Sequence, residues 1–265
     1  METVPTEVGS LRVEVDGSGP PAVLWHSLFL DSTSWTRLRG NLAEVRTLIL
    51  IDGPGHGANP TPPGPFSMAD CAAAALTILD AIGIARPVDW LGNAWGGHVG
   101  VFFAAGNPTA CRSLITIATP LRVLSPPERR KVRLLYELHR LVGPRPVAAL
   151  VTDALLGKAF RRSNPDAGAV VSASFVRANR AGMRDAIRSI SLNRADSTDR
   201  LPAVVAPTLM LTGADDAMCT PADTAAWAAR IPAGQSLVVP GAGHVTPLFQ
   251  PQTADVIRNF WTRSG

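Results

Sequence analysis

The N-terminal 120 residues alternate between short apolar runs and longer segments of helical character. Positions 11–15 alternate apolar and polar residues, as expected of a half-buried strand. Further runs rich in Val, Ile and Leu, typical of buried strands, lie at 22–25, 47–51, 88–91 and 113–118. Helices are predicted between them, at 34–42, at 67–82 with Ser67 as the N-cap, and from Trp95 onward. The pattern predicts an α/β fold with a mostly parallel sheet covered by helices on both faces.

The alternation stops at Leu121 and resumes after Asp199. Between these positions no segment has a convincing strand pattern, and helices are predicted at 127–141, 146–156, 167–178 and 181–189. Strands are expected again at 207–212 and 236–239, and helices at 221–230 and 252–262. We therefore predict a core formed by residues 1–120 and 200–265, and a helical lid insertion at 121–199.

A helical insertion of this kind is expected to cover a pocket at the carboxyl ends of the parallel strands, where such sheets bind ligands. Its larger apolar residues are expected to pack against one another inside the insertion rather than to contact substrate. They are Leu134, Leu135, Leu138, Val147, Leu150 and Phe160.

The chain has 265 residues, 46% hydrophobic and 17% charged, which is enough for the core of one large domain. The net charge is +4, and nearly all positive charge is arginine, with Lys131 and Lys158 the only lysines. Basic residues cluster at 129–133 and 161–162, which we interpret as solvated helix faces; attraction of an acidic substrate or acyl carrier is the alternative. No basic motif interleaved with aromatic residues is present, so no nucleic-acid partner is predicted.

Cys71, Cys111 and Cys219 are widely separated, and no pair has the spacing of metal ligands. They are predicted to be small buried side chains in a reducing compartment. Residues 1–11 are polar and acidic, unlike a signal peptide, and no apolar run reaches the ~18 residues of a membrane span. We therefore predict a cytoplasmic protein that acts on a small molecule, with no metal, cofactor or membrane partner. The sequence leaves the oligomeric state open.

The segment from Gly92 to Gly97 follows an apolar run and opens a predicted helix. A nucleophile elbow occupies this strand–turn–helix context, with small residues two positions before and after the nucleophile. The central residue here is Ala94. The surrounding pattern indicates an enzyme. A methyl group cannot attack a carbonyl, however, so Ala94 itself allows no covalent step.

Other landmarks occur in a compatible order around this segment. The chain resembles the α/β-hydrolase superfamily over nearly all of its length, and the order and spacing of the landmarks carry the resemblance. They are His26-Ser27 after a buried strand, the turn at 52–57, the elbow at 92–97, Gly213-Ala214-Asp215-Asp216, and Gly241-Ala242-Gly243-His244.

The resemblance implies a role for each matching residue. His244 matches the general base, and Asp216 matches the acid that orients it, with Asp215 as the alternative. The backbone N–H groups of Trp95 and Leu28 match the two donors of an oxyanion hole, which needs no side chain at position 94.

The remaining polar residues of the landmarks have weaker assignments. Ser27 replaces the usual glycine and is similar to the Asn-Ser-Leu segment of enol-lactone hydrolases; it is either tolerated or lines the pocket. His26 and His56 are expected to be structural, and His98 to be buried beside the elbow helix. The position of His139 is left open.

Three interpretations of Ala94 remain. It is an engineered replacement of a Ser or Asp nucleophile, or a native residue in a site where a His–Asp dyad performs non-covalent acid–base chemistry, or part of a protein that only binds a small molecule. Tyr136 is the only tyrosine, whereas epoxide hydrolases of this superfamily use two lid tyrosines. We therefore expect serine-type hydrolysis of a small, largely apolar ester or lactone, blocked as written if Ala94 is engineered. A lyase, isomerase or oxygenase run by the dyad is the alternative enzyme.

Overall fold

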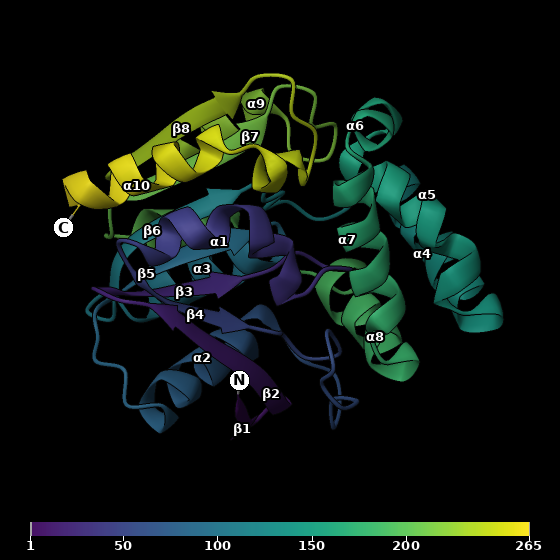
Figure 1. Cartoon of the computed structure of the whole chain (residues 1–265), viewed down its shortest axis with the longest axis horizontal. Helices are drawn as coiled ribbons and strands as arrows, with labels where there is room; N and C mark the ends of the chain where they lie inside the picture. The colour runs from purple at the N-terminus through teal and green to yellow at the C-terminus, as the bar shows by residue number, and fades with distance from the viewer. Residues whose placement is uncertain (1, 265) are drawn as a thin grey trace.

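The computed structural model describes residues 2–264. Its centre is an eight-stranded sheet in the order β1-β2-β4-β3-β5-β6-β7-β8 (Figure 1). The pairs β1–β2 and β2–β4 are antiparallel, and the other neighbouring pairs are parallel. From β1 to β8 the strands span Glu2–Thr6, Gly9–Gly17, Pro21–Trp25, Thr47–Ile51, Val88–Asn93, Cys111–Ile117, Thr208–Gly213 and Gly234–Val239. The predicted mostly parallel sheet is confirmed.

The central strands are buried along their whole length because helices cover both faces of the sheet. Every residue of β5 and β7 is buried, which explains why continuous apolar runs marked these strands in the sequence. The edge strand β1 was not predicted. Only Val4 of its five residues is buried, so the strand has no apolar periodicity and depends on pairing with β2.

Helices cover the sheet on both of its faces. α1 (Thr36–Ala43) and α10 (Gln252–Ser264) pack together in front of the sheet, and α2 (Met68–Ala81) and α3 (Trp95–Gly106) pack together behind it (Figure 1). α9 (Pro221–Ala228) lies against β7 and β8. Ser67 is the N-cap of α2, as the sequence predicted, and the structure adds a capping box with Asp70.

A run of helices separates β6 from β7 and lies beyond one end of the sheet (Figure 1). We call residues 121–199 the helical insertion. It contains α4 (Pro126–Val142), α5 (Pro144–Leu156), α6 (Lys158–Ser163), α7 (Pro165–Arg177) and α8 (Arg180–Ala186). The short α6 was not predicted. The Ser197 N–H donates to the Leu121 carbonyl at 3.0 Å, so the insertion leaves and rejoins the core at one place.

The turn between β5 and α3 is the most constrained point of the backbone. Ala94 has φ 45° and ψ −100°, a conformation that non-glycine residues adopt only when the surroundings enforce it. A Cβ on Gly96 would lie 1.9 Å from the Trp25 carbonyl oxygen, and one on Gly92 would lie 2.1 Å from the Gly96 carbonyl oxygen. The small residues that flank position 94 are therefore required by the close packing of β5, α3 and β3.

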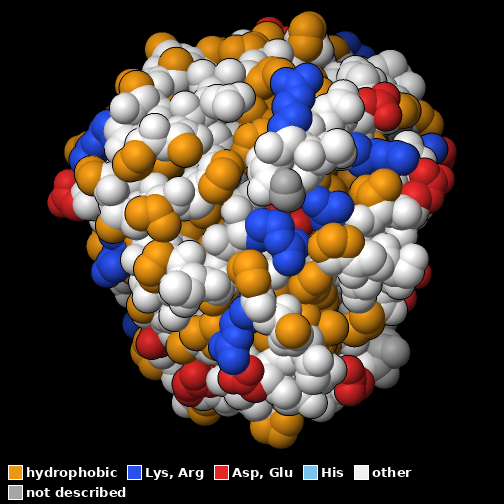
Figure 2. Space-filling model, turned by 90° about the vertical axis from the view of Figure 1, so that its left-hand side faces the viewer, with side chains coloured by type: hydrophobic (Ala, Val, Ile, Leu, Met, Phe, Trp, Pro, Cys, Tyr) orange, Lys and Arg blue, Asp and Glu red, His pale blue; other side chains and the backbone are white. Residues whose placement is uncertain are grey.

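The end of the sheet opposite the insertion has an ordinary charged surface. In Figure 2, which shows this side of the molecule, charged side chains of both signs are spread among apolar ones. Beneath it, at the start of β5, buried Asp89 accepts hydrogen bonds from Arg46 at 2.7 Å and Arg112 at 3.1 Å. This arrangement is a satisfied structural ion-pair cluster.

Candidate active site

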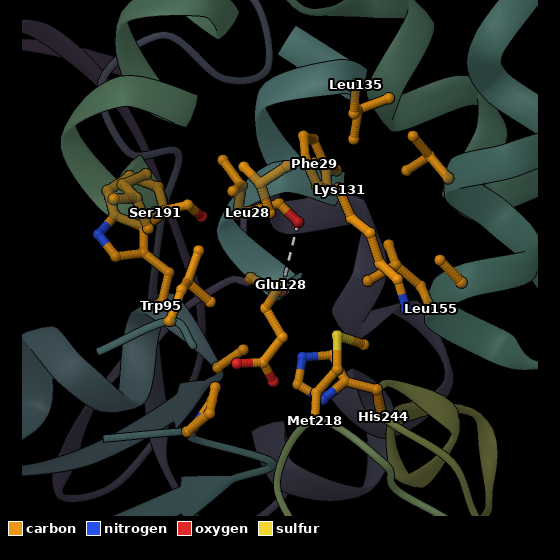
Figure 3. Close-up of a pocket in the computed structure, with 18 of the residues that line it drawn as sticks. Leu28, Phe29, Trp95, Glu128, Lys131, Leu135, Leu155, Ser191, Met218 and His244 are labelled. Carbon is orange, nitrogen blue, oxygen red and sulfur yellow. Dashed lines mark hydrogen bonds between the residues drawn. The ribbon is translucent and has the colours of Figure 1, made fainter. Parts of the chain in front are cut away.

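A cavity of about 570 Å³ lies between the carboxyl ends of the strands and the helical insertion (Figure 3). The core contributes residues that the sequence singled out, and the insertion contributes most of the apolar wall. From the core, the cavity is lined by Ser27, Leu28, Ala94, Trp95 and His244. A pocket at the predicted end of the sheet therefore brings together residues that follow three separate strands, β3, β5 and β8.

Ala94 forms the floor of this cavity between β5 and α3. Its N–H donates to the Ile117 carbonyl at 2.8 Å, and its carbonyl accepts from the His98 N–H at 3.1 Å. The first turn of α3 has no side-chain cap. Ala94 thus lies at the N-terminus of a helix, at the position where the sequence predicts a nucleophile.

His244 and Asp216 form a buried hydrogen-bonded pair. The distance from His244 Nδ1 to Asp216 Oδ2 is 2.8 Å. The other carboxylate oxygen accepts from the backbone N–H of Met218 at 2.8 Å and of Cys219 at 3.0 Å. Burial opposes ionisation of Asp216, but the interaction with His244 and the two N–H donors outweigh it and lower the pKa of Asp216. The neighbouring Asp215 is exposed and does not contact His244.

The backbone N–H groups of Leu28 and Trp95 both belong to residues that line the cavity. Within residues 2–264, neither N–H has a hydrogen-bond acceptor. Free backbone donors beside a cavity are suited to bind an oxygen that carries negative charge. The sequence predicts an oxyanion role for these same two N–H groups, and that role stays a prediction.

Two buried histidines hold the loop that carries Leu28. His26 Nε2 accepts from the Gly53 N–H at 2.9 Å, and His56 Nε2 accepts from the Phe29 N–H at 3.3 Å. Burial lowers the pKa of both rings, to about 3 for His56, so both are neutral and able to accept. Their structural role is as predicted. The Ser27 hydroxyl lines the cavity and donates to the Leu28 carbonyl at 3.3 Å.

One wall of the cavity is charged. For the basic cluster at 129–133 the sequence offered attraction of an acidic substrate only as the alternative, and it did not single out Arg122, Glu128 or Arg194. Glu128 of α4 accepts two hydrogen bonds from Arg122, at 2.8 and 2.9 Å. Arg194, from the end of the insertion, lies beside His98 of α3, with 3.3 Å between Arg194 Nη1 and His98 Nε2. Lys131 of α4 lines the same cavity (Figure 3). Arginine and glutamate are common on helix surfaces, so only their tertiary position distinguishes these residues.

The apolar wall differs from the expectation that the leucines of the insertion pack only against one another. Four of the six residues line the cavity, namely Leu134, Leu135, Leu138 and Leu150. Val147 and Phe160 do not line it. These four leucines line the cavity because they lie on the sides of α4 and α5 that face the core. The cavity lies between those sides and the sheet. His139, whose place was open, is buried against Phe175 and does not line the cavity.

The described part of the chain holds no cluster of His, Cys, Asp or Glu that could bind a metal ion. Cys71, Cys111 and Cys219 are buried free thiols, as predicted, and burial raises the pKa of each. Within residues 2–264 no helix has the length and apolar character needed to span a bilayer.

Comparison with known proteins agrees with this geometry. A family described as alpha/beta hydrolase fold matches residues 20–251. The chain belongs to the α/β-hydrolase family. It is 29% identical over 259 residues to a pimeloyl-[acyl-carrier protein] methyl ester esterase of Xanthomonas campestris, covering 94% of this chain and 98% of that protein. It is 23% identical over 233 residues to 3-oxoadipate enol-lactonase 2 of Acinetobacter baylyi, covering 88% and 85%.

Solved structures of other hydrolases are also similar to this α/β hydrolase along almost the whole chain. A thermophilic esterase from Thermogutta terrifontis superposes with a TM-score of 0.90 at 29% identity, covering 99% of this chain and 98% of that one. An enol-lactonase from Burkholderia xenovorans also has a TM-score of 0.90, and at 22% identity it supports the fold alone. The two relatives and the Thermogutta esterase are named for hydrolysis of esters and lactones, so the family-level activity is hydrolysis.

The Glu128–Arg122 pair of this α/β hydrolase gives a pH-dependent prediction. The hydrogen bond from Arg122 is the main reason that the pKa of Glu128 is lowered from 4.5 to about 2. A lowered folded-state pKa stabilises the protein above pH 4.5, and the contribution is lost as the pH falls toward 2. Since the pair is partly exposed, Glu128→Gln is expected to lower the free energy of unfolding by about 1 kcal/mol at pH 7.

Urea unfolding at pH 7 and at steps below pH 4.5 measures this effect. The difference between the parent and Glu128→Gln should shrink steadily as the pH falls. Glu137→Gln is the matched control on α4, because its ion pair with Arg140 is more exposed and should change stability less. A difference for Glu128→Gln that stays constant with pH would contradict the assigned pairing.

Proposed function

We propose that this α/β hydrolase binds a small, largely apolar ester or lactone in the cavity and hydrolyses it by general-base catalysis. The observation that carries the proposal is the composition of the site around Ala94. The hydrogen-bonded His244–Asp216 pair and the free N–H groups of Leu28 and Trp95 surround the same cavity, and only the nucleophilic oxygen is missing.

In the proposed complex the substrate carbonyl oxygen accepts from the Leu28 and Trp95 N–H groups. These donors stabilise the negative charge that develops on this oxygen when the carbonyl carbon is attacked. The helix dipole of α3 acts in the same direction, because Trp95 is the first residue of that helix. None of these interactions requires a side chain at position 94.

The attacking group in the chain as it stands is water, because Ala94 cannot form an acyl-enzyme. The water oxygen bonds to the carbonyl carbon while His244 Nε2 takes the water proton, giving a tetrahedral oxyanion. The carbon–oxygen bond to the alcohol then breaks, and His244 returns the proton to the departing alkoxide. An ester yields an acid and an alcohol, and a lactone yields a hydroxy acid.

Asp216 acts through His244 in this scheme. Its hydrogen bond to Nδ1 keeps the other ring nitrogen available as the base and stabilises the imidazolium that forms. The low pKa of Asp216 fits this role, since the carboxylate is charged throughout the neutral pH range.

The helical insertion is proposed to act as the lid of the site. Its leucines supply the apolar surface that excludes water from the cavity and contacts the substrate chain. The named relatives act on esters or lactones, which favours hydrolysis over the lyase or oxygenase chemistry that the same dyad could support.

The test is the rate of p-nitrophenyl butyrate hydrolysis by the chain with Ala94. His244→Ala and Asp216→Asn are each expected to lower this rate by about 10²-fold, the typical contribution of a general base. Asp215→Asn is the matched control, because it removes an adjacent exposed carboxylate and should leave the rate unchanged. Identical purification of all variants excludes a contaminating esterase as the source of the rate.

The comparison separates the two remaining functional classes. If His244→Ala hydrolyses the ester as fast as the parent, the general-base mechanism is wrong. A different result for the parent would identify a small-molecule binding protein. In that case the parent binds the ester but hydrolyses it no faster than buffer does.

A further inference from the structure

Arg194 stands out among the residues of the cavity wall because its charge is not balanced. Its guanidinium donates to the Arg122 carbonyl at 2.6 Å and lies 3.3 Å from His98 Nε2. These two contacts use two of the five N–H donors of an arginine. Nε is buried without a hydrogen-bond partner, and no carboxylate within residues 2–264 lies within ion-pair distance of Arg194.

The surrounding groups do not supply the missing negative charge. Among the residues that line the cavity, Glu128 is the only acid, and both of its oxygens already accept from Arg122. Asp196 and Glu128 attract Arg194 only from beyond contact distance, while Arg122 repels it. Burial, the largest cause, and this repulsion lower the pKa of Arg194 to about 10, so it remains charged at neutral pH.

His98 contacts Arg194 but does not balance its charge. Burial and the charge of Arg194 lower its pKa well below the ordinary value, so the ring is neutral and accepts from Arg194. Lys131 adds a second cation on the cavity wall with no carboxylate within ion-pair distance in the described chain. The cavity therefore combines a long apolar wall with charged lining residues, Arg122, Glu128, Lys131 and Arg194, that carry an excess of two positive charges.

We propose that the ester or lactone substrate of this site carries a carboxylate, which binds Arg194 while the apolar part of the substrate contacts the leucines of the insertion. The inference rests on the proposed function. A partly buried guanidinium without a counter-ion is costly, and a ligand carboxylate supplies the missing partner with charge-assisted hydrogen bonds. Lys131 adds longer-range attraction for the same anion.

The position of Arg194 also limits the length of the substrate. Arg194 contacts His98, which lies one turn of α3 after Ala94, and one helical turn rises about 5.4 Å. The carboxylate is therefore expected a few carbon atoms away from the reacting carbonyl. A half-ester of a short dicarboxylic acid, or a lactone with a short carboxylate side chain, meets this requirement.

Calorimetric binding of two matched ligands tests the proposal. Monobutyl glutarate carries the carboxylate, and the butyl ester of glutaramic acid replaces it with a neutral amide of the same shape. The parent chain is expected to bind the anion at least tenfold more tightly than the amide, the effect of one charge-assisted pair. Arg194→Gln should bring the two affinities within about twofold of each other, and Arg194→Lys should retain part of the preference.

Arg133→Gln is the matched control for net charge, since Arg133 is an exposed residue of α4 that does not line the cavity. It should leave the preference for the anion intact. Equal affinities of the parent for the two ligands would overturn the carboxylate proposal while leaving the proposed function in place. Failure of the parent to bind either ligand would overturn both. The comparison on the parent needs no variant, so a variant that does not fold cannot obscure the result.

Discussion

Ala94→Ser is expected to raise kcat/KM for p-nitrophenyl butyrate by about 10³-fold or more. The substitution adds the one oxygen that the site lacks, in a cavity that already holds a His–Asp pair and two free N–H donors. Restoring a triad nucleophile replaces direct water attack by two easier steps through an acyl-enzyme. Steady-state kinetics with a burst-phase measurement would detect both the gain and the acyl intermediate.

Ala94→Gly is the control for this result. Glycine adopts the positive φ of position 94 without strain but adds no nucleophile, so it isolates the effect of the backbone from that of the hydroxyl. It should not gain activity. An equal gain in Ala94→Gly and Ala94→Ser would show that relief of strain, and not nucleophilic attack, had changed the rate.

Gly96→Ala is expected to destabilise the protein by about 3 kcal/mol or more. The added Cβ would lie 1.9 Å from the Trp25 carbonyl oxygen and 2.5 Å from its carbonyl carbon. The added Cβ clashes with the backbone of β3, so β3 must shift against α3 to remove the clash. We therefore expect a larger loss of stability than ordinary overpacking of a core causes. Equilibrium unfolding in urea measures the loss.

Gly106→Ala provides the matched control in the same helix. No atom outside the local backbone lies within 4 Å of a Cβ added at Gly106. Alanine also has the higher helix propensity, so this variant should be as stable as the parent or slightly more stable. If Gly96→Ala and Gly106→Ala had the same stability, the close approach of β3 and α3 would not constrain the elbow.

The sequence predicted the parts of the site that depend on local backbone geometry. Gly92 and Gly96 marked the turn, and glycine-rich loops after β7 and β8 marked the positions of Asp216 and His244. The choice between Asp215 and Asp216 could not be made from the sequence, because it depends on which carboxylate the chain buries beside His244. The structure places Asp216 there, with a 2.8 Å hydrogen bond.

The sequence could not predict the charged wall. Arg194 and Glu128 come from opposite ends of the helical insertion, 66 positions apart, and meet only after α4 and the end of the insertion pack over the sheet. The apolar periodicity of α4 also does not distinguish residues that pack inside the insertion from leucines that line the cavity. The edge strand β1 and the short α6 were missed because neither has enough buried residues to produce a periodic pattern.

We propose that the site is complete for acyl transfer except for the oxygen at position 94. Intact-protein mass spectrometry after treatment with a fluorophosphonate tests it most directly, because this reagent labels only an activated serine. We expect one adduct on the serine introduced by Ala94→Ser, none on the parent, and strongly reduced labelling when His244→Ala is added. Absence of an adduct on folded Ala94→Ser, or labelling that does not depend on His244, would contradict it.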